Sequence, residues 1–85
     1  MYMQTTVYFL VHKDTERRLK YYRTLAGARI AQRARNRSLG FHERIERVEW
    51  DSNWEVEMCR DSNGEIVAAT YCVVEAIVDS EELFE

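Results

Sequence analysis

Three arginines, Arg29, Arg33 and Arg37, recur every four residues in a segment that is predicted to be helical. That spacing stacks them on one face of a helix, and a planar guanidinium binds phosphate or carboxylate through two parallel hydrogen bonds. No acidic residue lies between them on that face, so the like charges repel one another unless something offsets them. Two interpretations stay open: the arginines bind an anionic partner, or they pair with acids of the chain itself.

A second cationic group surrounds the pair Tyr21 and Tyr22 and consists of Arg18, Lys20 and Arg23. Tyrosines next to cations can stack on the bases of single-stranded nucleic acid. Paired tyrosines in a strand also pack within a hairpin, and we favour that interpretation.

Three acids form the last candidate set, Glu49, Glu55 and Glu57. Their alternation with apolar residues predicts one acidic face on a sheet, with Arg47 among the acids. Such a face could imitate the phosphates of a nucleic acid towards a basic target. It is also what an ordinary solvated face looks like, and we favour the solvated face.

Catalytic and metal-binding patterns are not found in the sequence. His12 and His42 have no nearby Cys, Ser or acid at a spacing that implies a site. Cys59 and Cys72 match neither a CxxC metal motif nor a disulfide framework, and we expect both to be free thiols. We therefore predict a non-enzymatic protein without a cofactor or metal.

Charge is divided sharply along the 85 residues. Residues 1–40 hold nine Lys or Arg and two acids, whereas residues 41–85 hold three Arg and thirteen acids. Such a dipolar chain is expected to bind its partner with electrostatic guidance. We expect the partner to be a protein, nucleic acid is the alternative, and a homodimer is left open. No apolar run approaches the ~20 residues of a membrane span, and no secretory signal is recognisable, so we expect no membrane association and a cytoplasmic location.

The first half of the chain is predicted to form two strands and a helix. Strands are expected over residues 5–12 and 18–23, followed by a helix over 25–38 that Thr24 caps and Gly40 ends, with Phe41 packing back. The competing interpretation is one long helix over residues 15–38, which would place Gly27 in its interior.

The second half is predicted to be an antiparallel meander. Strands are expected over residues 44–50, 54–60 and 65–78, the first two joined by a turn at 51–53 and the last two by a tight turn at Asn63-Gly64. A two-residue turn there pairs Met58 with Ala69, and places two groups of residues on opposite faces. The apolar face receives Trp54, Val56, Met58, Val67, Ala69, Tyr71 and Val73, and the acidic face receives Glu55, Glu57, Cys59, Ala68, Thr70 and Cys72.

The expected fold is therefore a small α+β domain over residues 1–78, in the order ββαβββ, with an antiparallel sheet and one helix packed on its apolar face. Residues 79–85 form an acidic C-terminal tail, which is expected to fray. The alternative is that Leu83 and Phe84 dock in a partner or fold back over the sheet.

Residues 22–31 follow a recognisable pattern, in which a strand runs into a Thr-capped helix with small residues every three or four positions. The pattern extends to residues 36–41. This segment resembles small phage-encoded and prokaryotic α+β proteins. The resemblance implies a phage accessory protein that inhibits or modulates a host or viral protein, in the host cytoplasm. It carries over no functional residue.

Overall fold

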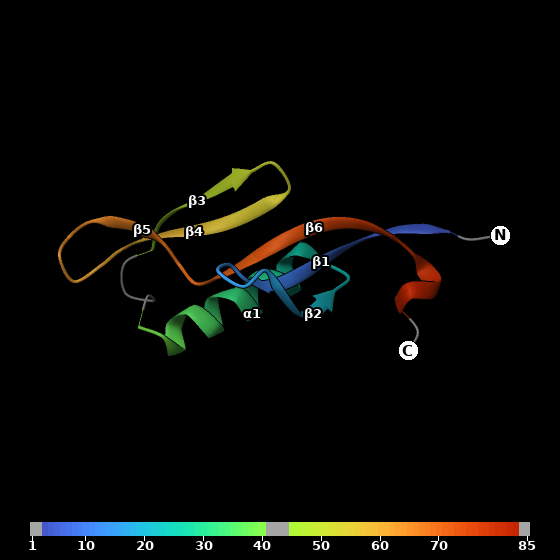
Figure 1. Cartoon of the computed structure of the whole chain (residues 1–85), viewed down its shortest axis with the longest axis horizontal. Coiled ribbons are helices and arrows are strands. Elements are labelled where there is room, and N and C mark those ends of the chain that lie inside the picture. The colour runs from blue at the N-terminus through green and yellow to red at the C-terminus, as the bar shows by residue number, and fades with distance from the viewer. Residues whose placement is uncertain (1–2, 41–44, 84–85) are drawn as a thin grey trace.

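The computed structural model describes residues 3–40 and 45–83. These residues form six strands, one α-helix and a final 3₁₀ helix: β1 (Gln4–His12), β2 (Arg17–Tyr22), α1 (Leu25–Ser38), β3 (Ile45–Asp51), β4 (Trp54–Arg60), β5 (Ile66–Ala68), β6 (Tyr71–Asp79) and η2 (Ser80–Leu83). The strands pair antiparallel in the order β2-β1-β6-β4-β3, with β5 also beside β4, and α1 lies on one side of the sheet (Figure 1). The predicted α+β domain with one helix on an antiparallel sheet is confirmed.

Helix α1 begins and ends where its sequence signals place it. Thr24 is extended, and its Oγ1 accepts a hydrogen bond from the Gly27 N–H at 3.1 Å. At the other end Gly40 takes the left-handed conformation, with φ +90°. Because residues 17–22 form β2, the alternative of one long helix is wrong. The expected packing of Phe41 lies outside the described residues.

The turn between β4 and β5 differs from the predicted one. Met58 pairs with Ala68 and Cys59 with Val67, one residue away from the expected register. The cause is Asp61, whose carboxylate accepts hydrogen bonds from the backbone N–H groups of Asn63 and Glu65 at 2.9 and 3.0 Å. These bonds enlarge the loop by one residue, and a one-residue shift changes which residues of the following strands share a face with a given residue of β4.

The predicted separation of β4 into a buried apolar face and an exposed acidic face is also wrong, because α1 covers the side of Glu55 and Glu57. The side chains of Glu55 and Glu57 are 1% and 2% exposed and point towards α1. Successive side chains of a strand point to opposite faces, so Trp54, Val56 and Met58 lie half-buried on the side away from the helix. The helix instead covers Leu10 and Val73, which lie in the same cross-strand row as Glu55.

The predicted last strand is divided into two. Ala69 and Thr70 separate β5 from β6, and carry the chain from the edge of β4 to the side of β1. The Ala69 N–H donates to Glu57 O at 2.9 Å, and the Lys13 N–H donates to Thr70 O at 2.8 Å, so the crossing is held from both sides. After β6 the chain continues into η2, where the sequence predicts a frayed tail. The Ser80 N–H donates to Met3 O at 2.8 Å, and this hydrogen bond ties the start of η2 to the residue before β1.

None of the helices within residues 3–40 and 45–83 combines the length and the apolar character that crossing a membrane requires.

Candidate binding surfaces

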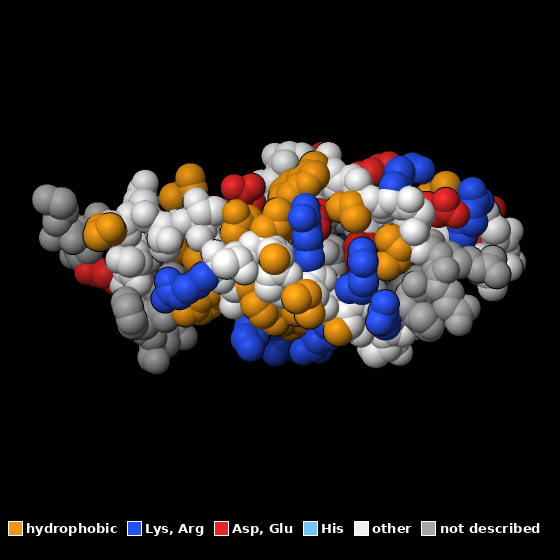
Figure 2. Space-filling view, turned by 180° about the vertical axis from the view of Figure 1, so that it is seen from behind, with side chains coloured by type: hydrophobic (Ala, Val, Ile, Leu, Met, Phe, Trp, Pro, Cys, Tyr) orange, Lys and Arg blue, Asp and Glu red, His pale blue; other side chains and the backbone are white. Residues whose placement is uncertain are grey.

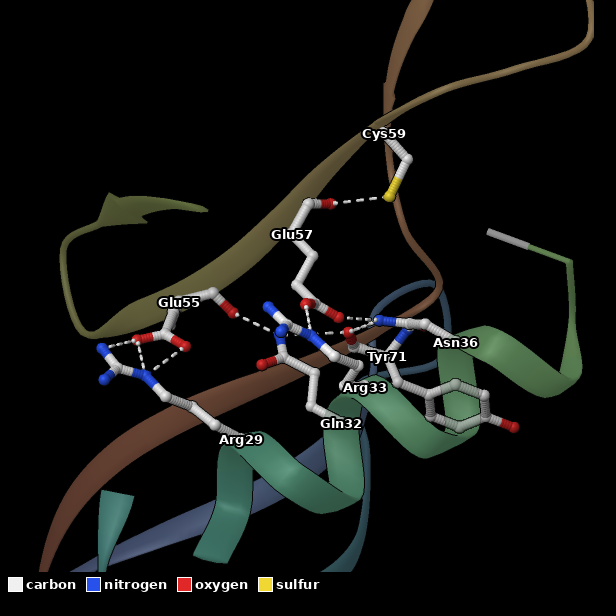
Figure 3. A network of polar contacts seen from close by, with 8 residues as sticks. All are labelled: Arg29, Gln32, Arg33, Asn36, Glu55, Glu57, Cys59 and Tyr71. Atoms are coloured by element: carbon white, nitrogen blue, oxygen red, sulfur yellow. Dashed lines mark hydrogen bonds and ion pairs between the residues drawn. The ribbon is translucent and has the colours of Figure 1, made fainter. Parts of the chain in front are cut away.

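Arg29 pairs with Glu55 across the gap between α1 and β4. Its Nε lies 3.0 Å from both carboxylate oxygens of Glu55, and its Nη2 lies 2.7 Å from Oε2 (Figure 3). Glu55 is 1% exposed whereas the Arg29 side chain is 51% exposed, so the carboxylate is buried and the guanidinium covers it from the solvent side. These hydrogen bonds raise the pKa of Arg29 further above its ordinary value, and the arginine stays charged.

Arg33 and Glu57 repeat this arrangement one helical turn further on. The Arg33 Nε donates to Glu57 Oε2 at 3.2 Å, and Asn36 Nδ2 donates to Oε1 of the same carboxylate at 2.9 Å. Glu57 is 2% exposed and the Arg33 side chain is 51% exposed. Both buried carboxylates are therefore satisfied by side chains of α1, as burial of a charge requires.

Two amide side chains on the inner face of α1 complete the network. Gln32 Nε2 donates to the backbone oxygens of Glu55 and Tyr71, at 3.2 and 3.3 Å. The amide of Asn36 donates to Tyr71 O at 3.0 Å and accepts from Tyr71 N–H at 2.9 Å, as a neighbouring strand would. Tyr71 begins β6, so Asn36 supplies the partner that the backbone lacks at this point (Figure 3).

The two ion pairs line up because the distance between Arg29 and Arg33 along the helix nearly equals the distance between Glu55 and Glu57 along the strand. Four residues of an α-helix rise about 6 Å, and two residues of a strand rise about 6.8 Å. Arg29 and Arg33 are therefore spaced like Glu55 and Glu57. Of the two interpretations of the arginine row, pairing with the chain's own acids is confirmed for these two arginines.

Arg37, the third arginine of the row, has no ion pair among the residues that the structure describes. Figure 2 shows the row of Lys and Arg side chains along the helix, with carboxylates directly beside two of them. The structure therefore brings together two of the three predicted arginines, and directs them inward to β4 rather than outward to a partner.

The predicted acidic face of Glu49, Glu55 and Glu57 does not form. Glu55 and Glu57 lie under α1, whereas Glu49 pairs with Val56 and so lies on the opposite face of the sheet. Arg47 Nε is also paired with Glu49 Oε1. The physical reason is the turn between β3 and β4, which holds two residues, Ser52 and Asn53, rather than the predicted three at 51–53. Glu49 therefore pairs with Val56 instead of Glu55 and lies on the other face from Glu55 and Glu57.

The second cationic group lies at β2, one end of the sheet order, with Arg18 and Lys20 in the strand and Arg23 directly after it. The Arg18 guanidinium lies 4.2 Å from the centre of the Phe9 ring, and Lys20 Nζ lies 5.4 Å from that of Tyr22. Tyr22 also packs against α1 beside Gly27, and Tyr21 makes an edge contact with Phe9. The tyrosines therefore pack within the hairpin, as we favoured.

The thiols and His12 do not assemble into a reactive site. Cys59 and Cys72 are free and fully buried, on opposite faces of the sheet rather than on one as predicted. Burial raises the pKa of Cys59, with a smaller contribution from Glu57, and raises that of Cys72 to about 11. His12 makes an edge contact with the Tyr71 ring at 5.5 Å. No group of three His, Cys, Asp or Glu that could hold a metal occurs in the described part of the chain.

Comparison of the chain with protein-family models, with curated protein sequences and with solved structures gives no match in any of the three. Of the candidate residues, Arg29 and Arg33 are engaged within the fold, whereas four exposed cations have no ion pair among the described residues: Arg18, Lys20, Arg23 and Arg37.

Proposed function

We propose that this chain is a non-enzymatic binding protein that captures a partner protein at the β2 edge of its sheet. The partner supplies an extended acidic segment, which pairs with β2 as an additional strand. The observation that carries the proposal is a contrast between paired and unpaired charges. Among the described residues Arg29, Arg33, Arg47 and Arg60 each meet a carboxylate, whereas the cations on β2 and directly after it do not. Arg35 and Arg37 also have no ion pair within this part of the chain, but they lie on α1, which offers no strand edge.

The ion pairs of residues 3–40 and 45–83 are Lys13–Asp14, Arg29–Glu55, Arg33–Glu57, Arg47–Glu49 and Arg60–Glu46. None of these pairs involves Arg17, Lys20 or Arg23, although all three are exposed. Figure 2 shows Lys and Arg side chains gathered along the lower border of the molecule, where Figure 1 places β2, with no carboxylate beside them in that view. This border attracts anionic groups and speeds their approach.

The backbone of β2 supports the same proposal. Within the described residues β1 is its one neighbour in the sheet, so every second residue of Arg17–Tyr22 directs its N–H and C=O away from the sheet. An edge of this kind accepts an added strand, in which main-chain hydrogen bonds give affinity and side chains give selectivity. The cations select a partner segment that carries acids and reject a basic one.

Binding of nucleic acid by the helix was the alternative, and the geometry gives it less support. Arg29 and Arg33 hold buried carboxylates, so each of their charges is already balanced within the fold.

The proposal includes a biological setting. The chain would act as an accessory protein in the cytoplasm of a phage-infected cell, where its partner is a host or viral protein.

The proposal is tested by comparing the binding of three labelled probes. The first is a peptide of alternating Glu and Val, the second is the same peptide N-methylated at alternate residues, and the third is a single-stranded oligonucleotide of equal charge. Fluorescence anisotropy should show that the unmodified peptide binds and that N-methylation weakens binding, because it removes strand-forming N–H groups. Equal binding of the oligonucleotide and both peptides would mean non-specific charge attraction and would refute strand addition.

A triple variant, Arg17→Gln, Lys20→Gln and Arg23→Gln, should weaken peptide binding about 10-fold, at roughly 0.5 kcal/mol for each exposed charge pair. Arg18 is retained because it packs on Phe9. The matched control removes the same charge elsewhere, with Gln at Arg35, Arg37 and Arg47, and should leave the dissociation constant within about twofold. A larger effect in the control would move the binding site away from β2.

A further inference from the structure

The sheet face away from α1 is apolar, and no described element packs over it. Its buried centre is Val11, Cys72 and Val74, with Phe9, Trp54 and Val56 packed around them and only half-buried. We call these six residues the open face. Helix α1 cannot cover it, because the helix lies on the side of Glu55 and Glu57.

The single chain buries less of its surface than a compact chain of this length does. All fully buried hydrophobic side chains are aliphatic or Cys, and the described Trp, Tyr and Phe side chains stay partly exposed. The radius of gyration is 13.9 Å, whereas a compact chain of 85 residues has about 12 Å. The accessible surface is 5891 Å², against about 5,300 Å² for a compact monomer of this size. Covering the open face would remove the excess of accessible surface.

One row of residues across the open face carries opposite charges at its two ends. Arg18 on β2 pairs with Val11, and Val11 pairs with Cys72. Val56 packs against the cluster that contains Cys72, and continuing the β4–β6 pairing of Trp54 with Val74 by two residues sets Val56 opposite Cys72. Val56 in turn pairs with Glu49 on β3, at the other border of the sheet. The row therefore has a cation at one end, three apolar residues in its middle and an acid at the other end.

We propose that the open face binds a second copy of this chain, as a face-to-face dimer with its twofold axis parallel to β6. Rotation about that axis reverses the order of the strands, so β2 of one copy lies over β3 of the other. Arg18 then faces Glu49 of the second copy at both borders, and the apolar middles of the rows meet. An axis across the strands would instead set Arg18 against Arg18 of the second copy.

The packing is that of an aligned β-sandwich, in which two sheets lie about 10 Å apart and interdigitate their side chains. Arg47 engages Oε1 of Glu49, which leaves Oε2 for the second copy. The dimer goes beyond the proposed function, since it does not use Arg17, Lys20 or Arg23, and failure of either proposal leaves the other standing.

The test is a charge exchange between two variants, Arg18→Glu and Glu49→Lys, measured by sedimentation velocity. The wild type should be dimeric at micromolar concentration. Each variant alone sets like charges together at both borders and should dissociate at least 10-fold more readily. An equimolar mixture should recover the dimer, because in the mixed pair both contacts again join opposite charges. Circular dichroism checks that each variant is folded.

A wild type that is monomeric throughout this range overturns the proposal. So does a dimer that neither variant weakens, or a mixture that does not recover. A second pair of variants locates the face: Val56→Glu should abolish the dimer, and Ile30→Glu, at a 72% exposed position on α1, should leave it unchanged. The opposite outcome would place the interface on the helix and overturn the proposal.

Discussion

Replacing Arg29 with Gln should destabilise the fold by about 2 kcal/mol, because it leaves the Glu55 carboxylate buried without its guanidinium. Removing one partner of a fully buried ion pair costs about 3–5 kcal/mol. Here Glu55 is 1% exposed but Arg29 is 51% exposed, so water can approach the vacated side and the cost is lower. For a domain of 85 residues, about 2 kcal/mol lowers the melting temperature by roughly 10 °C.

Urea unfolding followed by tryptophan fluorescence measures this loss, with Trp50 paired directly across from Glu55 as a local probe. Arg37→Gln is the matched control on the same helix and should stay within about 0.5 kcal/mol of the wild type. The double variant with Arg29→Gln and Glu55→Gln should recover part of the loss, since no buried charge then lacks its partner. If Arg29→Gln costs no more than Arg37→Gln, or if the two losses simply add, the pair does not hold the helix to β4.

Two further predictions concern the buried thiols and the β4–β5 turn. Because burial raises the pKa of Cys72 from 9.0 to about 11, the unfolded chain ionises first, and stability should fall between pH 9 and 11. Unfolding curves across this range should show a smaller fall for Cys72→Ala, and an equal fall would contradict the assignment. Asp61→Ala removes two hydrogen bonds of the turn and should cost about 1–2 kcal/mol, whereas Asn63→Ala should cost less in the same urea assay. A greater loss at Asn63 would favour a two-residue turn.

The elements with local signals could be predicted from the sequence. Thr24 and Gly40 fix the ends of α1 through backbone hydrogen bonding and a left-handed residue, and both signals lie within a few residues of the structure that they determine. The strands β1 to β4 follow from β-branched and aromatic residues in the same way.

The register between β4 and β5 could not be predicted, because it depends on one hydrogen-bonding side chain outside the turn signal. Asn63-Gly64 favours a two-residue turn, and the Asp61 carboxylate overrides it by capping two backbone N–H groups. Glu55 and Glu57 were expected in solvent because the helix was expected on the apolar side of β4, whereas it covers the side of these two acids. The matching spacings of Arg29 and Arg33 with these two acids were visible in the sequence, and would have indicated that the acids face the helix.

Mapping the peptide site by nuclear magnetic resonance tests the binding proposal most directly. The ¹⁵N-labelled chain is titrated with the peptide of alternating Glu and Val, and amide shifts are followed along the backbone. The largest changes should fall on β2, with slowed hydrogen exchange at its outward N–H groups. Changes centred on α1 around Arg33 and Arg37, or an absence of changes at β2, would contradict it.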